Sequence, residues 1–525
     1  MTTMILKKIF QKKPQLWPLD KLDYGILAGG LAVYAALAFA TITKFSVWFD
    51  EAFGAYLIRF DFWQVTTYTA ADVHPPLYYW FLKLWSMVFG TGEVGLRSMS
   101  IFFGGVAIIF AYLLVKRLFG RRAAIFSLLL MALSPMFIRY SQEMRMYTLV
   151  AAIVMSATYV LTLAMETGKC KLWIVYGILI SLGMWTHYFA ALAWLAHWVW
   201  RAFVVGTTET RKDFIRKFFS KEWIIAHAVA IGLFAAWVPA LIFQLLNVQI
   251  NGFWIPPVTP TTLPNYLTNV LYYQDQDTVY SWVTLFFMIT LAGLLIGAVW
   301  LYRRLNNKDR QSFALIGALS FVPIVLLFLA SMPPLRPSFV DRYLIPTTLA
   351  LMLFAGVILA FVTKAKKKLL PIGLTVVTIL SLGFGIYNVY ELGNYNKNLR
   401  TSNNTRQALE VVWEKGRSGE PIITDGPWVF YEAIFYTSDK HPVYFPDAST
   451  DYKYGSLNML REHDYGKVKD LKEFGQKHDT VWYVSRSGNG AVTPPDSSWR
   501  QLQQMTVGDL VSGQPLYKVT QYQTR

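Results

Sequence analysis

The segment from Ser98 to Val115 reads SMSIFFGGVAIIFAYLLV, and the seven residues after it, 116–122, read KRLFGRR. An α-helix needs about 20 mostly apolar residues to cross a bilayer, and this run with its flanks has that length. A basic cluster directly after such a run is typical of a helix end on the cytoplasmic side of a membrane. This one stretch therefore predicts a transmembrane helix together with its orientation.

The same pattern recurs along residues 1–390. Ten further apolar runs are separated, in alternation, by basic clusters and by loops with few basic residues. The eleven candidate spans begin near Tyr24, Ser98, Ala123, Met146, Leu172, Tyr188, Trp223, Ser281, Ser312, Tyr343 and Leu369. The sequence therefore predicts a polytopic α-helical membrane protein with about eleven transmembrane helices.

The charge distribution supports the same class of protein. The 525 residues include 49 Lys and Arg against 32 Asp and Glu, a net charge of +17, and only 15% of residues are charged. A soluble domain carries about 25% charged residues. A nucleic-acid-binding protein would gather its basic residues on a polar folded face, whereas these lie in short clusters between apolar runs. The single cysteine excludes a disulfide scaffold.

The basic clusters also predict which way the chain faces. Of the 33 basic residues in residues 1–390, 25 fall on one face of the predicted topology. They are Lys7, Lys8, Lys12, Lys13, Lys21, Lys116, Arg117, Arg121, Arg122, Lys169, Lys171, Arg201, Arg211, Lys212, Arg216, Lys217, Lys221, Arg303, Arg304, Lys308, Arg310, Lys364, Lys366, Lys367 and Lys368. By the positive-inside rule this face is cytoplasmic, so we expect a multi-pass protein of the cell membrane with its N-terminus inside. Eleven spans then place the C-terminal part outside.

Residues 391–525 predict a separate, soluble α/β domain on the extracytoplasmic side. Their 16 basic and 16 acidic residues balance, unlike those of residues 1–390. Residues 405–415 have helical spacing, and 421–424 and 480–484 are short β-prone runs bounded by turn residues.

The first outer loop, about 44–97, is too long for a simple connection and carries the clearest chemical signal. It opens with Trp48-Phe49-Asp50-Glu51. Two adjacent carboxylates among aromatic residues are partly desolvated, which raises a carboxylate pKa and suits a general base. A solvated helix cap is the alternative, and the aromatic residues at 48, 49 and 53 argue against it.

The same loop continues with Asp72-Val73-His74-Pro75-Pro76-Leu77. A proline pair fixes the backbone and can start a helix. His74 would then lie at a helix N-terminus, where an anion is favoured. A bare surface turn explains the residues equally well.

Two further outer segments carry cations. The loop 134–147 contains Arg139 and Arg145, which could hold a phosphate, although Glu143 could equally pair with either of them. Arg342 enters an apolar helix from the outer side, next to Tyr343, and an arginine there binds either lipid phosphate or a ligand phosphate. The candidate substrate- and phosphate-binding residues are His74, Asp72, Arg139, Tyr140, Glu143, Arg145, Tyr147, Arg342 and Tyr343, beside the candidate catalytic residues Asp50 and Glu51.

Together these segments place two carboxylates and several cations at one membrane face. None of the predicted spans has a carboxylate in its middle, which argues against an ion-coupled transporter. A base and an anion clamp next to lipid indicate a lipid-phosphate substrate. The carboxylates of Asp50, Glu51 and Asp72 could bind a divalent metal, but no His or Cys ligand spacing in the sequence requires one.

These motifs, in this order, resemble those of the GT-C membrane glycosyltransferases. The resemblance is to the bacterial branch with protein O-mannosyltransferases and with the aminoarabinose and galacturonic acid transferases that modify lipopolysaccharide. It covers roughly residues 20–390 and rests on Asp50-Glu51, His74-Pro75-Pro76-Leu77, Tyr140-Ser141-Gln142-Glu143-Met144-Arg145 and Arg342-Tyr343.

The resemblance implies an enzyme that takes a sugar from a polyprenyl phosphate and passes it to a lipid, glycan or protein acceptor at the outer membrane face. The family's acidic residue maps to Asp50 and its outer arginine to Arg342. The phosphate-contacting basic residue maps to His74, a position that is often Lys in the aminoarabinose transferases. The implied mechanism is a single inverting displacement, with Asp50 as base and with Arg342, Arg145 and His74 stabilising the leaving phosphate.

Two other functions would fit a membrane protein of this kind. A flippase or transporter of lipid-linked sugars would need polar groups along a path through the bundle, and the sequence has few. A non-catalytic scaffold would not need paired acids and arginines in separate loops.

Overall fold

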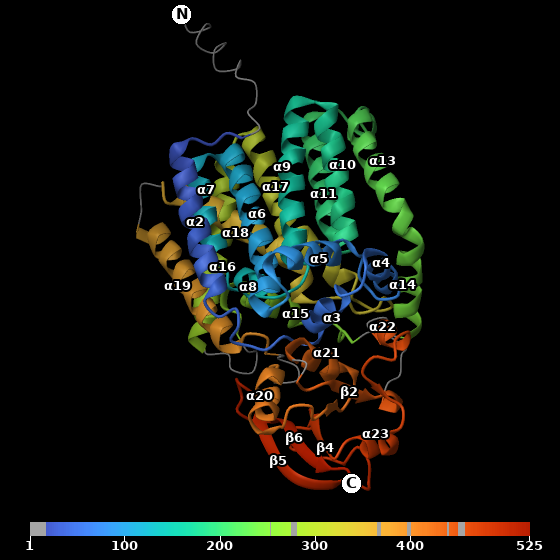
Figure 1. Cartoon of the computed structure of the whole chain (residues 1–525). Coiled ribbons are helices and arrows are strands. Elements are labelled where there is room, and N and C mark those ends of the chain that lie inside the picture. Colours follow the sequence, from blue (N-terminus) through green and yellow to red (C-terminus); the bar gives the residue numbers. More distant parts are fainter. Residues whose placement is uncertain are drawn as a thin grey trace, which may run out of the picture.

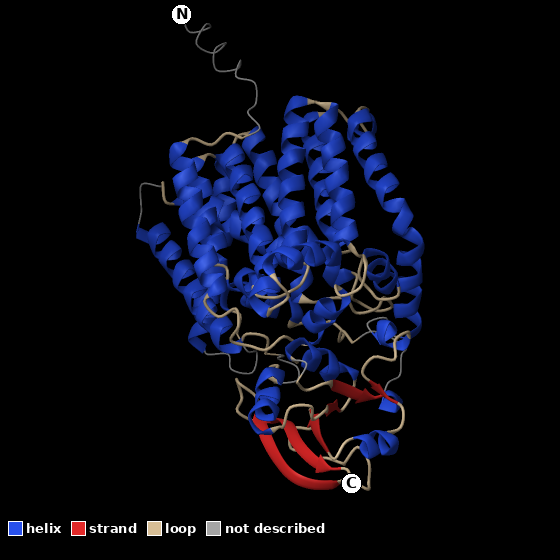
Figure 2. Cartoon of the chain, viewed as in Figure 1, coloured by secondary structure: helices blue, strands red, loops and turns tan. Residues whose placement is uncertain are grey.

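The computed structural model of the chain describes residues 17–251, 254–274, 281–364, 369–395, 401–437, 440–449 and 457–525. Long helices form a bundle, and a smaller domain that contains all the strands of Figure 2 covers one end of it (Figures 1 and 2). The predicted class, a polytopic helical membrane protein with a C-terminal α/β domain, is confirmed. The predicted basic residues Lys7, Lys8, Lys12, Lys13, Lys366, Lys367 and Lys368 lie outside the described residues.

Within the described residues, eight helical segments are long and apolar enough to cross a membrane. They are α2 (Lys21–Phe39), α6 (Glu93–Phe119), α9 (Tyr147–Thr167), α13 with η1 and α14 (Lys221–Phe234, Ala235–Trp237, Val238–Asn251), α16 (Ser281–Arg304), α17 (Asn307–Leu329), η3 with α18 (Asp341–Leu344, Ile345–Val362) and α19 (Leu369–Leu392). The pair α7 (Arg121–Ala132) and α8 (Pro135–Ser141), bent by 59°, could be a ninth.

Every predicted span coincides with a helix, but eleven spans are not established. The helix α10 (Cys170–Thr186) has only 17 residues, and α11 (Ala190–Thr208), although 19 residues long, is less apolar than the eight segments above. A short helix, α12 (Phe214–Phe218), follows α11. The break between α7 and α8 falls at Ser134-Pro135, because proline has no N–H to continue the hydrogen-bond ladder.

The basic cluster of the opening segment lies at the α6–α7 turn. Gly120 makes this turn with a φ of 85°, a conformation that favours glycine. The buried carboxylate of Asp23 in α2 pairs there with Lys116 and Arg121. The turn is therefore fixed against the start of α2, at the end of the bundle that lies away from the C-terminal domain (Figure 1).

The predicted first outer loop is helical over much of its length. It contains α3 (Phe49–Leu57), α4 (Phe62–Ala70) and α5 (Leu77–Phe89). Pro76 precedes the first residue of α5, as the proline pair predicts. With α8 and α15 (Thr262–Tyr272), these helices lie at the end of the bundle that faces the C-terminal domain (Figure 1).

The C-terminal domain is a six-stranded sheet with helices. Its elements are α20 (Thr405–Lys415), β1 (Ile422–Thr424), α21 (Pro427–Tyr436), β2 (Val443–Pro446), η4 (Asp447–Ser449), α22 (Asn458–Arg461), β3 (Lys467–Val468), α23 (Leu471–Lys477), β4 (Thr480–Ser485), β5 (Arg500–Gly508) and β6 (Pro515–Gln523). The strand order is β3-β2-β1-β4-β6-β5, parallel from β3 to β4 and antiparallel at β6 and β5. The predicted helix and both predicted strands are present.

Cys170 tests the predicted orientation. It is the first residue of α10, exposed, and it lies between Lys169 and Lys171. If the basic face is cytoplasmic, a membrane-impermeant thiol reagent should leave Cys170 unlabelled in intact cells and label it after permeabilisation. Labelling in intact cells would reverse the orientation and would place the site described below inside the cell.

Candidate functional site

Three charged side chains from distant parts of the sequence meet at the end of the bundle near the C-terminal domain. Asp50 lies in the first turn of α3, Arg145 in the turn between α8 and α9, and Arg342 in η3. The Asp50 Oδ2 atom is 3.7 Å from Arg145 Nη2 and 3.9 Å from Arg342 Nη2. These distances are within ion-pair range but too long for hydrogen bonds. The cluster has one more positive than negative charge.

Arg342 lies between two indole rings. Its guanidinium carbon is 5.3 Å from the ring centre of Trp48 and 5.1 Å from that of Trp254. The Nε atom is buried and has no hydrogen-bond partner among the described residues. The neighbouring Asp341 accepts a hydrogen bond from Asn269 at 2.8 Å. Arg342 is thus held by aromatic faces while part of its hydrogen-bonding capacity stays unused.

Arg145 is also buried and lies beside the same carboxylate. Its Nη1 atom is 3.3 Å from both the Asp50 carbonyl oxygen and the Tyr79 hydroxyl. Its Nε atom also has no partner in the described part of the chain. Two guanidinium groups with unused donors beside one carboxylate form a site that could receive an anion such as a phosphate.

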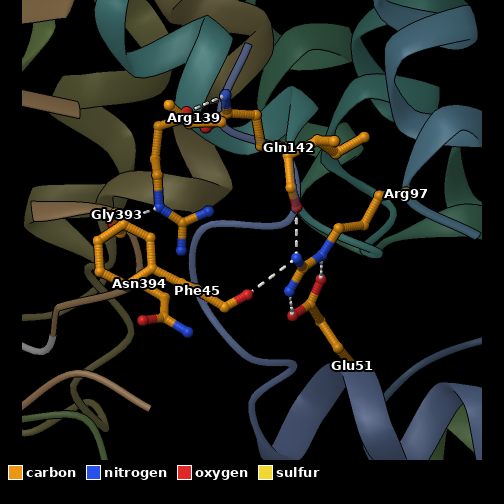
Figure 3. A pocket seen from close by; sticks show the side chains of 9 residues that line it. Phe45, Glu51, Arg97, Arg139, Gln142, Gly393 and Asn394 are labelled. Carbon is orange, nitrogen blue, oxygen red and sulfur yellow. Dashed lines mark hydrogen bonds and ion pairs between the residues drawn. The ribbon is translucent and has the colours of Figure 1, made fainter. Parts of the chain in front are cut away.

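Glu51 has a different environment from Asp50, although the two are adjacent. Arg97 in α6 donates to both of its carboxylate oxygens, at 2.8 and 2.7 Å (Figure 3). The Met144 amide also donates to Glu51, at 2.9 Å. Arg97 also donates to the carbonyl oxygens of Ile42 and Phe45. Burial alone would raise the pKa of Glu51, but the Arg97 charge and these hydrogen bonds outweigh it and hold the pKa below its usual value. Glu51 therefore fixes the chain on either side of Asp50.

Arg139 and Glu143 form the ion pair that the sequence allows as an alternative to phosphate binding. Arg139 Nη1 is 3.0 Å from Glu143 Oε2, and Arg139 Nε donates to the Gly393 carbonyl oxygen at 2.6 Å. The Trp48 indole donates to Glu143 at 3.1 Å. Burial raises the pKa of Glu143 despite its arginine partner. This pair orients Trp48, one of the two rings that flank Arg342.

Asp72 and His74 lie close together in the loop before α5. His74 Nδ1 is 3.6 Å from Asp72 Oδ2 and is buried without a hydrogen-bond partner among the described residues. Burial raises the pKa of Asp72 to about 6, and burial together with the Arg145 charge lowers the pKa of His74 to about 3. His74 is therefore neutral near pH 7 and could contribute a hydrogen bond rather than a positive charge.

The three predicted tyrosines line the same region. The Tyr140 and Tyr147 rings are 5.5 Å apart, and Tyr343 stacks on Phe189 at 4.6 Å. The His187 ring lies 4.9 Å from Tyr343 and 5.5 Å from His74. These rings form one aromatic wall of the site. The structure thus brings Asp50, Arg145, Arg342, His74 and Tyr343 towards one place, whereas Glu51, Arg139 and Glu143 form the supporting ion pairs.

Sequence reasoning missed five residues at this site: Trp48 and Trp254 as arginine-stacking rings, Tyr79, Arg97 and His187. A signal existed for Arg97, an arginine at the start of an otherwise apolar helix, because such a charge requires a partner. No sequence pattern distinguishes His187 or Trp254 from ordinary loop residues.

The described donor set does not fit a divalent cation. No group of three or more His, Cys, Asp or Glu side chains with the spacing of a metal site occurs in the described ranges. Asp50 faces two guanidinium groups, and both oxygens of Glu51 accept from Arg97. A cation at this point would face repulsion from Arg145 and Arg342.

Comparison with known proteins identifies the fold. The chain has the GT-C fold of membrane glycosyltransferases, which confirms the resemblance seen in the sequence. Residues 73–248 match the family described as dolichyl-phosphate-mannose-protein mannosyltransferase, about a third of the chain. No curated protein sequence matches.

Among solved structures, ArnT from Cupriavidus metallidurans in the apo state is similar at 13% identity. The match covers 95% of this chain and 98% of that one, with a TM-score of 0.61. ArnT bound to undecaprenyl phosphate matches with the same identity and coverage and a TM-score of 0.57. The Archaeoglobus fulgidus oligosaccharyltransferase also matches, at 13% identity over 80% of this chain and 64% of that one, with a TM-score of 0.48. At 13% identity, the likeness to ArnT shows the fold alone.

Proposed function

We propose that this protein is an inverting glycosyltransferase that moves a sugar from a polyprenyl-phosphate donor to a hydroxyl acceptor at the outer face of the cell membrane. One observation carries the proposal: the Asp50 carboxylate faces Arg145 and Arg342 within 4 Å. A single displacement at an anomeric carbon needs a base for the acceptor and positive charge for the leaving phosphate, and these three groups supply both.

The reaction proceeds in one step. Asp50 takes the proton from the acceptor hydroxyl, and the hydroxyl oxygen forms a bond to the anomeric carbon of the donor. The bond from that carbon to the phosphate oxygen breaks, and the electron pair leaves with the prenyl phosphate. Arg145 and Arg342 stabilise the growing negative charge, since their buried Nε–H groups have no other partner in the described chain.

The environments of the other predicted residues support the following roles. Asp50 serves as the base because it is partly exposed, with 24% of its side chain accessible, whereas Glu51 is 1% accessible and bound to Arg97. His74 contributes a hydrogen bond to the phosphate or sugar, since its lowered pKa keeps it neutral. Arg139 and Glu143 act through Trp48, and the stacked Tyr343 forms part of the donor-binding wall.

Similarity to a protein solved with undecaprenyl phosphate favours a prenyl phosphate as the lipid. The purified protein should carry such a lipid, which mass spectrometry of its organic extract would detect. Incubated in detergent with a lipid extract from its native membrane, it should release free prenyl phosphate when acceptor material is added. A flippase or a scaffold would release none in detergent, where no membrane separates two compartments, and that result would refute the proposal.

A further inference from the structure

The segment that leads to Asp50, residues 43–48, obtains many of its hydrogen bonds from the C-terminal domain. The Val47 amide donates to the Tyr436 hydroxyl at 2.7 Å, and Asn403 donates to the Val47 carbonyl oxygen. Arg406 donates to the Thr43 carbonyl oxygen at 2.9 Å, and its own amide donates to the Ser46 hydroxyl at 3.2 Å. Backbone groups next to the proposed base therefore depend on side chains more than 350 residues away in sequence.

The same tail residues converge on Glu93, at the start of α6. Arg406 Nη1 is 2.9 Å from Glu93 Oε2, and the Tyr436 hydroxyl donates to Glu93 Oε1. Glu93 also lies 4.0 Å from Arg97, the arginine that binds Glu51. A continuous polar network thus connects the C-terminal domain to the residue directly after Asp50.

An aromatic contact reinforces this network. The helix α21 packs on α3, with the Trp428 ring 4.2 Å from Phe49 and the Tyr431 ring 5.2 Å from Tyr56. Phe49 directly precedes Asp50. The helix that carries Asp50 is therefore held by the bundle through Glu51 and Arg97 and by the C-terminal domain through α21.

We infer that the C-terminal domain completes the site, and that Tyr436 and Arg406 are positioning residues that hold Asp50 in its reactive place; this inference rests on the proposed function. Neither residue touches the reacting groups. They act on Asp50 through the segment 43–48 and through Glu93. Since a displacement of about 1 Å can cost about 10²-fold in rate, loosening this segment lowers turnover while Arg145 and Arg342 still bind phosphate.

Tyr436→Phe removes the hydroxyl that accepts from Val47 and donates to Glu93, and it keeps the ring. We expect turnover of the full-length protein to fall about tenfold or more, with the affinity for undecaprenyl phosphate, used as the probe, within about twofold of wild type. Without any ligand, amide hydrogen exchange should speed up in residues 42–50. Arg406→Met should have the same effects. The double variant Tyr436→Phe with Glu93→Gln should lose less turnover than the two single losses combined, because both changes remove the same Tyr436–Glu93 contact.

Two matched controls come from the same domain. Tyr444, whose ring packs on Phe474, and Arg500, which donates to Gln523, lie among the strands of the tail. Tyr444→Phe and Arg500→Met should leave turnover and exchange in residues 42–50 unchanged.

Unchanged turnover in both Tyr436→Phe and Arg406→Met would overturn the inference. The inference would also fail if these variants lost turnover, probe affinity and thermal stability together and Tyr444→Phe did the same. Such a pattern would indicate general destabilisation of the domain. An inactive Asp50→Asn with fully active Tyr436→Phe and Arg406→Met would refute the positioning role alone. An active Asp50→Asn would remove Asp50 as the base, and no release of prenyl phosphate by the wild-type protein would refute the proposed function.

Discussion

Asp50→Asn should lower the rate of sugar transfer by about 10²–10⁴-fold, the usual contribution of a general base. Asparagine keeps the shape of the side chain but cannot take the acceptor proton. The affinity for polyprenyl phosphate should stay the same or rise, because the change removes a negative charge 3.7 and 3.9 Å from Arg145 and Arg342. Single-turnover assays of prenyl phosphate release, beside equilibrium binding of the lipid, separate the two effects.

Asp61→Asn is the matched control for this variant. Asp61 lies in the same loop, is exposed and caps α4 through Gln64, and asparagine caps a helix about as well as aspartate. The turnover of Asp61→Asn should equal that of wild type.

Glu51→Gln, in contrast, leaves Arg97 without its buried partner and should lower the free energy of unfolding by about 3–5 kcal/mol. Near-normal transfer by Asp50→Asn would disprove the assignment of the base.

Arg342→Met should weaken the binding of polyprenyl phosphate by about 10- to 100-fold, the worth of a hydrogen-bonded contact to a charged group. Transfer should fall at least as far, because the leaving phosphate carries more charge in the transition state than in the donor. Arg342→Lys should keep part of the activity, since lysine retains the charge but loses both the planar fork and the stacking between Trp48 and Trp254.

Arg336→Met is the matched control, because Arg336 lies in the segment that leads to Arg342, is exposed and donates to the Gln249 carbonyl oxygen. It should bind the lipid normally. The midpoint of thermal unfolding should be similar for all three variants. If Arg342→Met kept both its lipid affinity and its turnover, Arg342 would be an anchor at the membrane interface, and the phosphate site would rest on Arg145 and His74.

Much of the fold follows from local patterns along the chain. Apolar runs of membrane-spanning length predict helices wherever they occur, because an unpaired backbone in lipid is too costly to persist. The helix at 405–415 and the strands β1 and β4 likewise follow from residue spacing. The number of spans does not follow from local patterns in the same way. Residues 121–141 form a bent helix pair and residues 170–208 form one short and one less apolar helix, and the path of such helices depends on what they pack against.

The sequence also identifies Asp50, Arg145 and Arg342 as candidates, since each is a charge at the end of an apolar stretch that needs a partner. Residue spacing alone does not separate them from Glu51 and Arg139, although the family resemblance favours Asp50 and Arg145. Adjacent helical residues point about 100° apart, so Asp50 and Glu51 face different surroundings, and only the fold shows that Arg97 takes up Glu51. In the same way, Glu143 pairs with Arg139 and leaves Arg145 facing Asp50.

The membrane class, the long helices, the α/β tail and the short list of charged residues follow from composition and from spacing within about 20 residues. Which charges meet depends on the tertiary structure. Asp50 and Arg342 are nearly 300 residues apart, and Tyr436 reaches Val47 from another domain. Such contacts depend on how helices pack and where the C-terminal domain docks, and side-chain distances of a few ångströms are set by that packing rather than by any pattern in the chain.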